Sequence, residues 1–107
     1  MEHADLTLLA VAQVKDIPVG KMIGADVAGE RVLIANVDGA LFAMRAKCNH
    51  MGGPLDQGTL EKNVVTCPLH GSKWDVKTGL LVQFPRPLPP ERIYKVVVDG
   101  NQVFVEV

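Results

Sequence analysis

Both cysteines of this 107-residue chain and two of its three histidines fall into two short, matching segments. The first is Cys48–His50 (Cys-Asn-His), and the second, sixteen residues further on, is Cys67–His70 (Cys-Pro-Leu-His). Thiolate and imidazole together suit zinc or an iron–sulfur cluster. Each segment supplies one side chain of each kind, so the pattern predicts a metal site built from two loops. The candidate ligands are Cys48, His50, Cys67 and His70.

The way these ligands are shared between the loops bears on the identity of the metal. A structural zinc finger usually takes two cysteines from one knuckle and two histidines from another. Here each loop is mixed, which suits a two-iron cluster with both cysteines on one iron and both histidines on the other. The glycines of this region fit that interpretation, because loops around inorganic sulfide need close backbone amides and unusual φ angles. A zinc-stabilised β module without a redox role is the alternative.

Charge and hydropathy exclude several classes of protein. The net charge is −1 and the basic residues are scattered in ones and twos, so we expect no nucleic-acid partner. The apolar run Leu8–Val11 is far too short to span a bilayer. Glu2 and Asp5 occupy a region that a secretory signal would keep positive. We therefore expect a soluble, cytoplasmic protein without a membrane partner, whose cysteines are metal ligands or catalytic thiols and not a disulfide.

Short β-strands must position the two loops. Sixteen valines against five aromatic residues, with glycine and proline between the apolar runs, indicate an all-β chain of nine or ten strands. Asp38-Gly39 and Asp99–Asn101 predict two hairpin turns. No segment shows a sustained helical period. The expected strands lie within residues 6–11, 21–27, 30–36, 41–47, 61–66, 73–82, 93–98 and 102–107.

The region from Cys48 to Pro90 differs from the hairpins on either side of it. It is rich in glycine and ends in the proline-dense run Phe84–Pro90, which is predicted to be a rigid surface loop because proline cannot join the interior of a sheet. No repeat or linker divides the chain, so one domain over residues 1–107 is expected. No nucleophile–base pair, phosphate loop or dinucleotide fingerprint is present. An electron carrier is therefore expected, and not an enzyme.

The two segments closely resemble the cluster-binding boxes of Rieske iron–sulfur proteins. They read CNHMG from Cys48 and CPLHG from Cys67, and their spacing is typical of that family. The resemblance covers most of the chain. It implies an all-β fold, a three-sheet sandwich or barrel with a small inserted cluster-binding subdomain at about residues 48–82. It also implies one [2Fe-2S] cluster per chain and a proline run that buttresses the cluster loops.

The branch of the family follows from one position next to the first box and one position within the second. Rieske proteins of the respiratory and photosynthetic cytochrome complexes have a membrane anchor and a further cysteine in each box, joined as a disulfide. Gly53 and Leu69 stand at those positions here. The resemblance therefore implies a low-potential, Rieske-type ferredoxin that passes single electrons from a reductase to a terminal Rieske oxygenase, as part of a dioxygenase system. The alternative is a small Rieske subunit of a larger reductase, such as nitrite reductase.

Ser72 and Trp74 are the candidate residues around the cluster. In the high-potential branch, these places resemble a serine and a tyrosine whose hydroxyls donate to cluster and cysteine sulfur. Hydrogen bonds to sulfur set the potential within the range of the class, which is about −150 to +300 mV. We therefore predict an intermediate potential that Ser72→Ala lowers. The alternative roles are a turn cap for Ser72 and core packing for Trp74.

Overall fold

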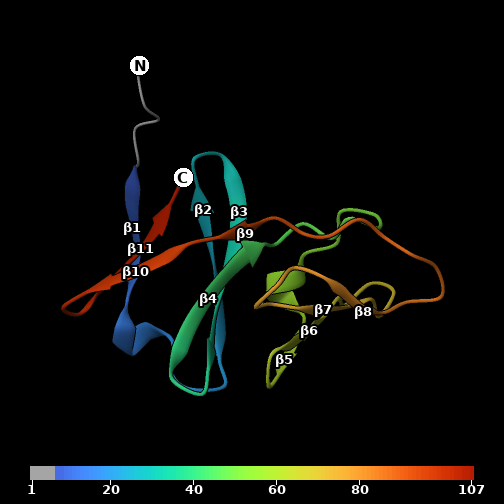
Figure 1. Cartoon of the computed structure of the whole chain (residues 1–107), viewed down its shortest axis with the longest axis horizontal. Helices are drawn as coiled ribbons and strands as arrows, with labels where there is room; N and C mark the ends of the chain where they lie inside the picture. The colour runs from blue at the N-terminus through green and yellow to red at the C-terminus, as the bar shows by residue number, and fades with distance from the viewer. Residues whose placement is uncertain (1–6) are drawn as a thin grey trace.

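The computed structural model describes residues 7–107 as an all-β protein with three antiparallel sheets, which confirms the expected fold class. Leu6, where the first expected strand begins, lies outside the described residues. The molecule is flat, measuring 41 × 37 × 19 Å, and the three sheets follow one another along its length (Figure 1). Two short 3₁₀ turns, η1 (Val14–Asp16) and η2 (Leu55–Gln57), account for the helical residues. Within residues 7–107, no helix has the length and apolar character that crossing a membrane requires.

The first sheet joins the two ends of the described chain. β1 (Leu8–Gln13) pairs with β11 (Gln102–Glu106), which pairs on its other side with β10 (Val96–Asp99). Val103 and Val105 of β11 are fully buried, whereas the residues beside them are exposed or half-buried. This alternation is the two-residue period of a strand with one face in the core.

The second sheet forms the middle of the molecule. Its order is β2 (Met22–Val27), β3 (Glu30–Val37), β4 (Ala40–Arg45) and β9 (Ile93–Tyr94). The turn between β3 and β4 contains Asp38-Gly39, whose φ angles are 55° and 96°. Positive φ at both positions is what a type I′ hairpin turn requires, so this predicted turn is confirmed.

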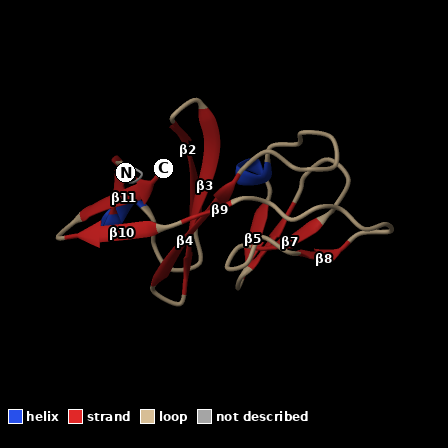
Figure 2. Ribbon diagram, turned by 45° about the horizontal axis from the view of Figure 1, so that its top comes forward, coloured by secondary structure: helices blue, strands red, loops and turns tan. Residues whose placement is uncertain are grey.

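β3 is buried on both of its faces. Leu33 and Ala35 pack into one apolar core, together with Trp74 and the cysteines. Val32 and Ile34 pack into a second core, together with the valines of β11. The continuous apolar sequence from Val32 to Ala35 therefore serves both cores at once. Figure 2 shows the middle sheet standing between the other two.

The third sheet arises from the segment between β4 and β9. Its order is β5 (Thr59–Glu61), β6 (Val64–Thr66), β7 (Lys73–Asp75) and β8 (Leu81–Gln83). Cys67 directly follows β6 and Ser72 directly precedes β7, so this hairpin presents the second candidate loop at its end.

Two expected strands of this region are wrong, because each contains a turn. The segment 61–66 is divided at Lys62, which has a φ of 56° and reverses the chain between β5 and β6. The segment 73–82 is divided by a turn in which Gly79, with a φ of 79°, donates to the Asp75 carbonyl at 2.7 Å. A lysine in the left-handed region has no local signal in the sequence, which is why the first turn was not predicted.

The expected strand 93–98 is also divided. β9 pairs with β4 in the second sheet, and β10 pairs with β11 in the first sheet, with Lys95 between them. The chain therefore changes sheets without a turn. Residues 7–107 contain eleven strands, so the expected count of nine or ten is too low.

Candidate functional site

The first candidate loop is closed by two backbone hydrogen bonds. The Cys48 amide donates to the Gly53 carbonyl at 2.8 Å, and the Gly52 amide donates back to the Cys48 carbonyl at 2.8 Å. Gly52 has a φ of 73°, a conformation that costs glycine little and other residues more. The loop thus holds Cys48 at its base and places His50 near its tip.

The second loop repeats this pattern. The Cys67 amide donates to the Ser72 carbonyl at 2.8 Å, and the Gly71 amide donates to the Cys67 carbonyl at 3.1 Å. Gly71 has a φ of 76°. The two loops therefore have the same backbone hydrogen bonding, although their histidines stand two and three residues after the cysteine.

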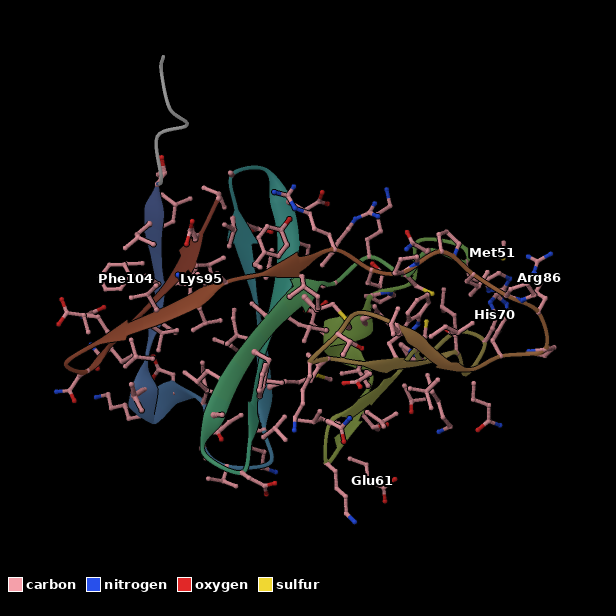
Figure 3. The ribbon with its side chains drawn as sticks, viewed as in Figure 1. Met51, Glu61, His70, Arg86, Lys95 and Phe104 are labelled. Atoms are coloured by element: carbon pink, nitrogen blue, oxygen red, sulfur yellow. The ribbon has the colours of Figure 1, made fainter. Side chains whose placement is uncertain are left out.

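The four candidate ligands separate into an inner and an outer pair. Cys48 and Cys67 are buried, each with 3% of its surface exposed. His50 is half-buried and His70 is exposed, and their ring centroids lie 4.8 Å apart in an edge-to-face contact. Figure 3 shows His70 at the end of the molecule that lies away from the first sheet. The thiols therefore lie in the core and the imidazoles at the surface.

This arrangement fits a binuclear cluster. Among residues 7–107, no three histidine, cysteine, aspartate or glutamate side chains gather closely enough to hold one metal ion. A structural zinc site needs four donors around a single ion. A mixed iron–sulfur cluster takes two thiolates on one iron and two imidazoles on the other, and the two loops together offer two thiols and two imidazoles.

Glycine is required where the first loop approaches the second. A Cβ atom at Gly53 would lie 2.7 Å from the Cys67 Sγ and 3.0 Å from the Leu69 side chain. The backbone of one loop therefore lies directly against the thiol of the other loop. Gly53 and Leu69 are also the two positions by which the sequence was distinguished from the cytochrome-complex branch.

Ser72 and Trp74 are both fully buried beside Cys48. The Ser72 Oγ lies 3.3 Å from the Cys48 Sγ, and the Trp74 indole Nε1 donates to the same Oγ at 3.0 Å. The backbone amide of His50 also points to the Cys48 Sγ, at 3.4 Å. The indole thus contacts the serine and not a cysteine sulfur.

Asn49, between the first two candidate ligands, ties the loop to the proline run. Its side-chain amide donates to the carbonyls of Pro89 and Pro90 at 3.0 and 2.9 Å. Its side-chain oxygen accepts from the Arg45 guanidinium at 3.1 Å. The proline run therefore buttresses the first loop, as the resemblance implied. Asn49 was not singled out from the sequence, since Pro89 and Pro90 lie about 40 residues away.

Phe84 is a second residue of the site that the sequence did not single out. Its ring centroid lies 4.6 Å from that of His50, so the start of the proline run covers one candidate ligand. Partial burial, together with His70 and Arg86, lowers the pKa of His50 below its ordinary value. Because only a neutral imidazole binds a metal, these surroundings favour the binding form of His50.

Glu91 lies behind the first loop and is the least expected group of the site. Only 3% of its surface is exposed, and its Oε2 accepts the Asn49 amide proton at 2.7 Å. Its Oε1 has no hydrogen-bond partner among the described residues. Burial raises the pKa of Glu91 to about 7, although the Asn49 amide and Arg45 oppose this shift.

We expect this carboxyl group to make folding pH-dependent. The unfolded chain loses the proton near pH 4.5, whereas the folded chain retains it up to about pH 7. Between these values the unfolded state binds fewer protons, so the free energy of unfolding falls as the pH rises, by about 3 kcal/mol in total. Glu91→Gln is expected to remove this fall. Urea unfolding of the cluster-loaded protein at pH 5 and pH 8 measures it.

The matched control is Glu61→Gln, because Glu61 is exposed. This variant is expected to keep the pH dependence of the parent chain. Other titrating groups contribute equally to parent and variant, so the difference between them isolates Glu91. Equal pH dependence in the parent and Glu91→Gln would show that Glu91 ionises normally in the folded protein.

Comparison with known proteins places this geometry in a family. The sequence model of the family described as "Rieske [2Fe-2S] domain" matches residues 7–100. The chain is 33% identical over 102 residues to the biphenyl dioxygenase ferredoxin subunit of Pseudomonas sp. (strain KKS102), covering 94% of this chain and 93% of that protein.

Solved structures give the same result. The ferredoxin of carbazole 1,9a-dioxygenase from Nocardioides aromaticivorans IC177 superposes with a TM-score of 0.87 and 33% identity, over 92% of this chain and 96% of that one. A second match is a chain in the structure of the complex of reduced oxygenase and oxidized ferredoxin in carbazole 1,9a-dioxygenase. Its TM-score is 0.85 and its identity 27%, over 92% of this chain and 91% of that one. The resemblance seen in the sequence is confirmed: the chain belongs to the Rieske [2Fe-2S] domain family.

Proposed function

We propose that the protein is a one-electron carrier in which Cys48 and Cys67 hold one iron of a [2Fe-2S] cluster and His50 and His70 hold the other. The observation that carries this proposal is the division of the four side chains into a buried thiol pair and a surface imidazole pair, on two loops of the same backbone design. The proposal takes residues 1–107 as one domain, with residues 48–82 as its cluster-binding part.

The surroundings of the four ligands suit electron transfer and not catalysis. When bound, a cluster of this kind takes up and releases one electron. Because all four ligand positions are filled by the protein, no position is left for a substrate. Two thiolates and two neutral imidazoles bring the oxidised site close to zero net charge, which favours reduction relative to an all-cysteine site. The chain is therefore a component of an oxidoreductase system and not its enzyme.

Burial decides where electrons enter and leave. The thiols lie in the core that Trp74 and Leu55 fill, so protein covers that side of the site. The imidazoles lie at the surface, beside the exposed side chains of Met51 and Leu69, which are 68% and 56% exposed. Electrons therefore pass through the histidine end.

The partners follow from the relatives. The relatives named above are ferredoxin components of dioxygenases, and one matched structure is a complex of a ferredoxin with an oxygenase. We accordingly propose a reductase as the donor and a terminal Rieske oxygenase as the acceptor, both in the cytoplasm. No role in binding nucleic acid or a membrane is proposed.

An EPR spectrum of the dithionite-reduced protein, with iron and sulfide analysis, tests the cluster. We expect about two irons and two sulfides per chain and a spin-half signal with the low average g value of mixed histidine–cysteine ligation. If the protein contains zinc and no iron and gives no EPR signal, it is a structural module and not an electron carrier. A signal of the all-cysteine type would mean that the ligands are wrong.

The partners need a separate test. The reduced protein is mixed with an oxidised terminal oxygenase of the biphenyl dioxygenase type, and the absorbance of both proteins is followed. Rapid oxidation of the carrier is expected. A correct EPR signal without electron transfer, together with co-purification with a large reductase subunit, would favour a subunit of that reductase instead.

A further inference from the structure

Three buried side chains form a line that ends on a candidate ligand. Trp74 and Ser72 are fully buried and Cys48 is 3% exposed. The indole Nε1 lies 3.0 Å from the Ser72 Oγ, which lies 3.3 Å from the Cys48 Sγ. Trp74 is at the centre of β7, opposite Val65 of β6, so its ring is held by the sheet and by the core.

The chemistry of the three groups fixes the direction of both hydrogen bonds. An indole N–H only donates, so the Ser72 oxygen must accept from Trp74. A cysteine that holds iron has lost its proton and can only accept. The Ser72 hydroxyl then has one proton to donate, and among the described residues the Cys48 sulfur is the acceptor within its reach. Among the described residues, Ser72 Oγ has no other hydrogen-bond partner.

We propose that Trp74 is a positioning residue that raises the reduction potential of the site by holding the Ser72 hydroxyl in the orientation that donates to Cys48. The inference rests on the proposed function, because the hydroxyl matters to the potential only if Cys48 binds the cluster. Trp74 does not touch the sulfur. Its effect passes through Ser72.

The physical reason is the charge that reduction adds. An added electron makes the ligand sulfur a stronger acceptor, so a donor to that sulfur stabilises the reduced state more than the oxidised state. Buried hydrogen bonds in a chain polarise one another, so an N–H donor on the Ser72 oxygen makes its O–H a better donor. Without the indole, the hydroxyl is free to rotate away from Cys48 and its oxygen is left without a donor.

Three variants test this relay, the hydrogen-bonded chain from Trp74 through Ser72 to Cys48. They are Ser72→Ala, Trp74→Phe and the double variant. At a fixed potential, Ser72→Ala is expected to lower the ratio of reduced to oxidised protein by about tenfold, equivalent to about 59 mV for one electron. Trp74→Phe is expected to lower the ratio in the same direction, by a smaller factor than Ser72→Ala. In the double variant, Trp74→Phe is expected to add nothing to Ser72→Ala. Protein-film voltammetry or an EPR redox titration measures each ratio.

A merely structural role for Trp74 would give a different result. Loss of packing would lower the stability of Trp74→Phe with or without Ser72, and any shift in potential would persist in the Ser72→Ala background. Tyr94→Phe is the matched control, since Tyr94 is buried in the other core and its loss of a polar group is expected to leave the potential unchanged. An unchanged potential in Trp74→Phe would overturn the relay.

A second measurement does not depend on the variants of Trp74. The chain has one tryptophan, so its indole N–H gives a single, unambiguous proton NMR signal. In the oxidised protein, Ser72→Ala is expected to shift this signal and to speed its exchange with solvent, because the N–H loses its acceptor. An unchanged signal would overturn the contact. If the proposed function itself is wrong, the unsubstituted protein will contain no iron. That result would be known from iron analysis before any variant is made.

Discussion

The chain with Cys67→Ala is expected to be purified without iron, sulfide or visible colour. Alanine offers no donor, so one iron would keep a single protein thiolate in a buried site that water does not reach. Loss of a group that only supports a ligand already costs about 10–100-fold in metal affinity, and loss of the ligand itself costs more. Iron and sulfide analysis, with the visible spectrum, measures the result.

His3→Ala is the control, because His3 is the third histidine of the sequence and lies in neither box. It is expected to retain about two irons per chain. A far-ultraviolet CD spectrum with β content in Cys67→Ala would show that the chain still folds and that the ligand alone is missing. Retention of the full iron content by Cys67→Ala would remove Cys67 from the ligand set.

Gly58→Ala is expected to have the second largest effect, since it would displace the second loop. A Cβ atom at Gly58 would overlap the carbonyl oxygen of Thr66 and lie 3.2 Å from the Cδ of Pro68. These two residues flank Cys67, and a backbone carbonyl cannot rotate away as a side chain can. We expect a loss of about 3 kcal/mol in the free energy of unfolding, at the upper end of overpacking costs, and a reduced iron content.

Gly100→Ala separates this clash from the general cost of replacing glycine. Gly100 has a φ of 62° in the turn between β10 and β11, and a Cβ there meets nothing within 4 Å. Only the strain of the left-handed conformation is expected, about 1 kcal/mol, with the iron content unchanged. Urea unfolding and iron analysis of both variants make the comparison. If both variants lose the same free energy of unfolding, the second loop shifts to accommodate the Cβ atom at Gly58 without an additional energetic cost.

The ligand loops could be predicted because their candidate ligands are of residue types that are rare in this chain. Two cysteines and three histidines in 107 residues leave few ways to build a site, and the spacing of the boxes carries its own information. The Asp38-Gly39 turn could be predicted for a similar reason, since few residue pairs accept positive φ at both positions. In each case the information is local.

The parts that could not be predicted depend on distant partners. The contact between Asn49 and the proline run joins segments about 40 residues apart, and nothing near Asn49 in the sequence indicates it. The change of sheet at Lys95 is equally hidden, because Ile93 and Tyr94 before it and the three valines after it all suit a strand in either sheet. Ser72 and Trp74 were singled out, but the bond between them depends on their side-chain geometry, which the spacing alone does not fix.

The double burial of β3 has a consequence for how the molecule unfolds. Leu33 faces the core that contains the cysteines, and Ile34, its neighbour, faces the core closed by β11. Neither core can open fully without exposing one face of the same strand to water, so the metal end and the far end share one cooperative unit. Cluster retention is therefore coupled to packing in the first sheet, and a cavity there would shorten the lifetime of the cluster.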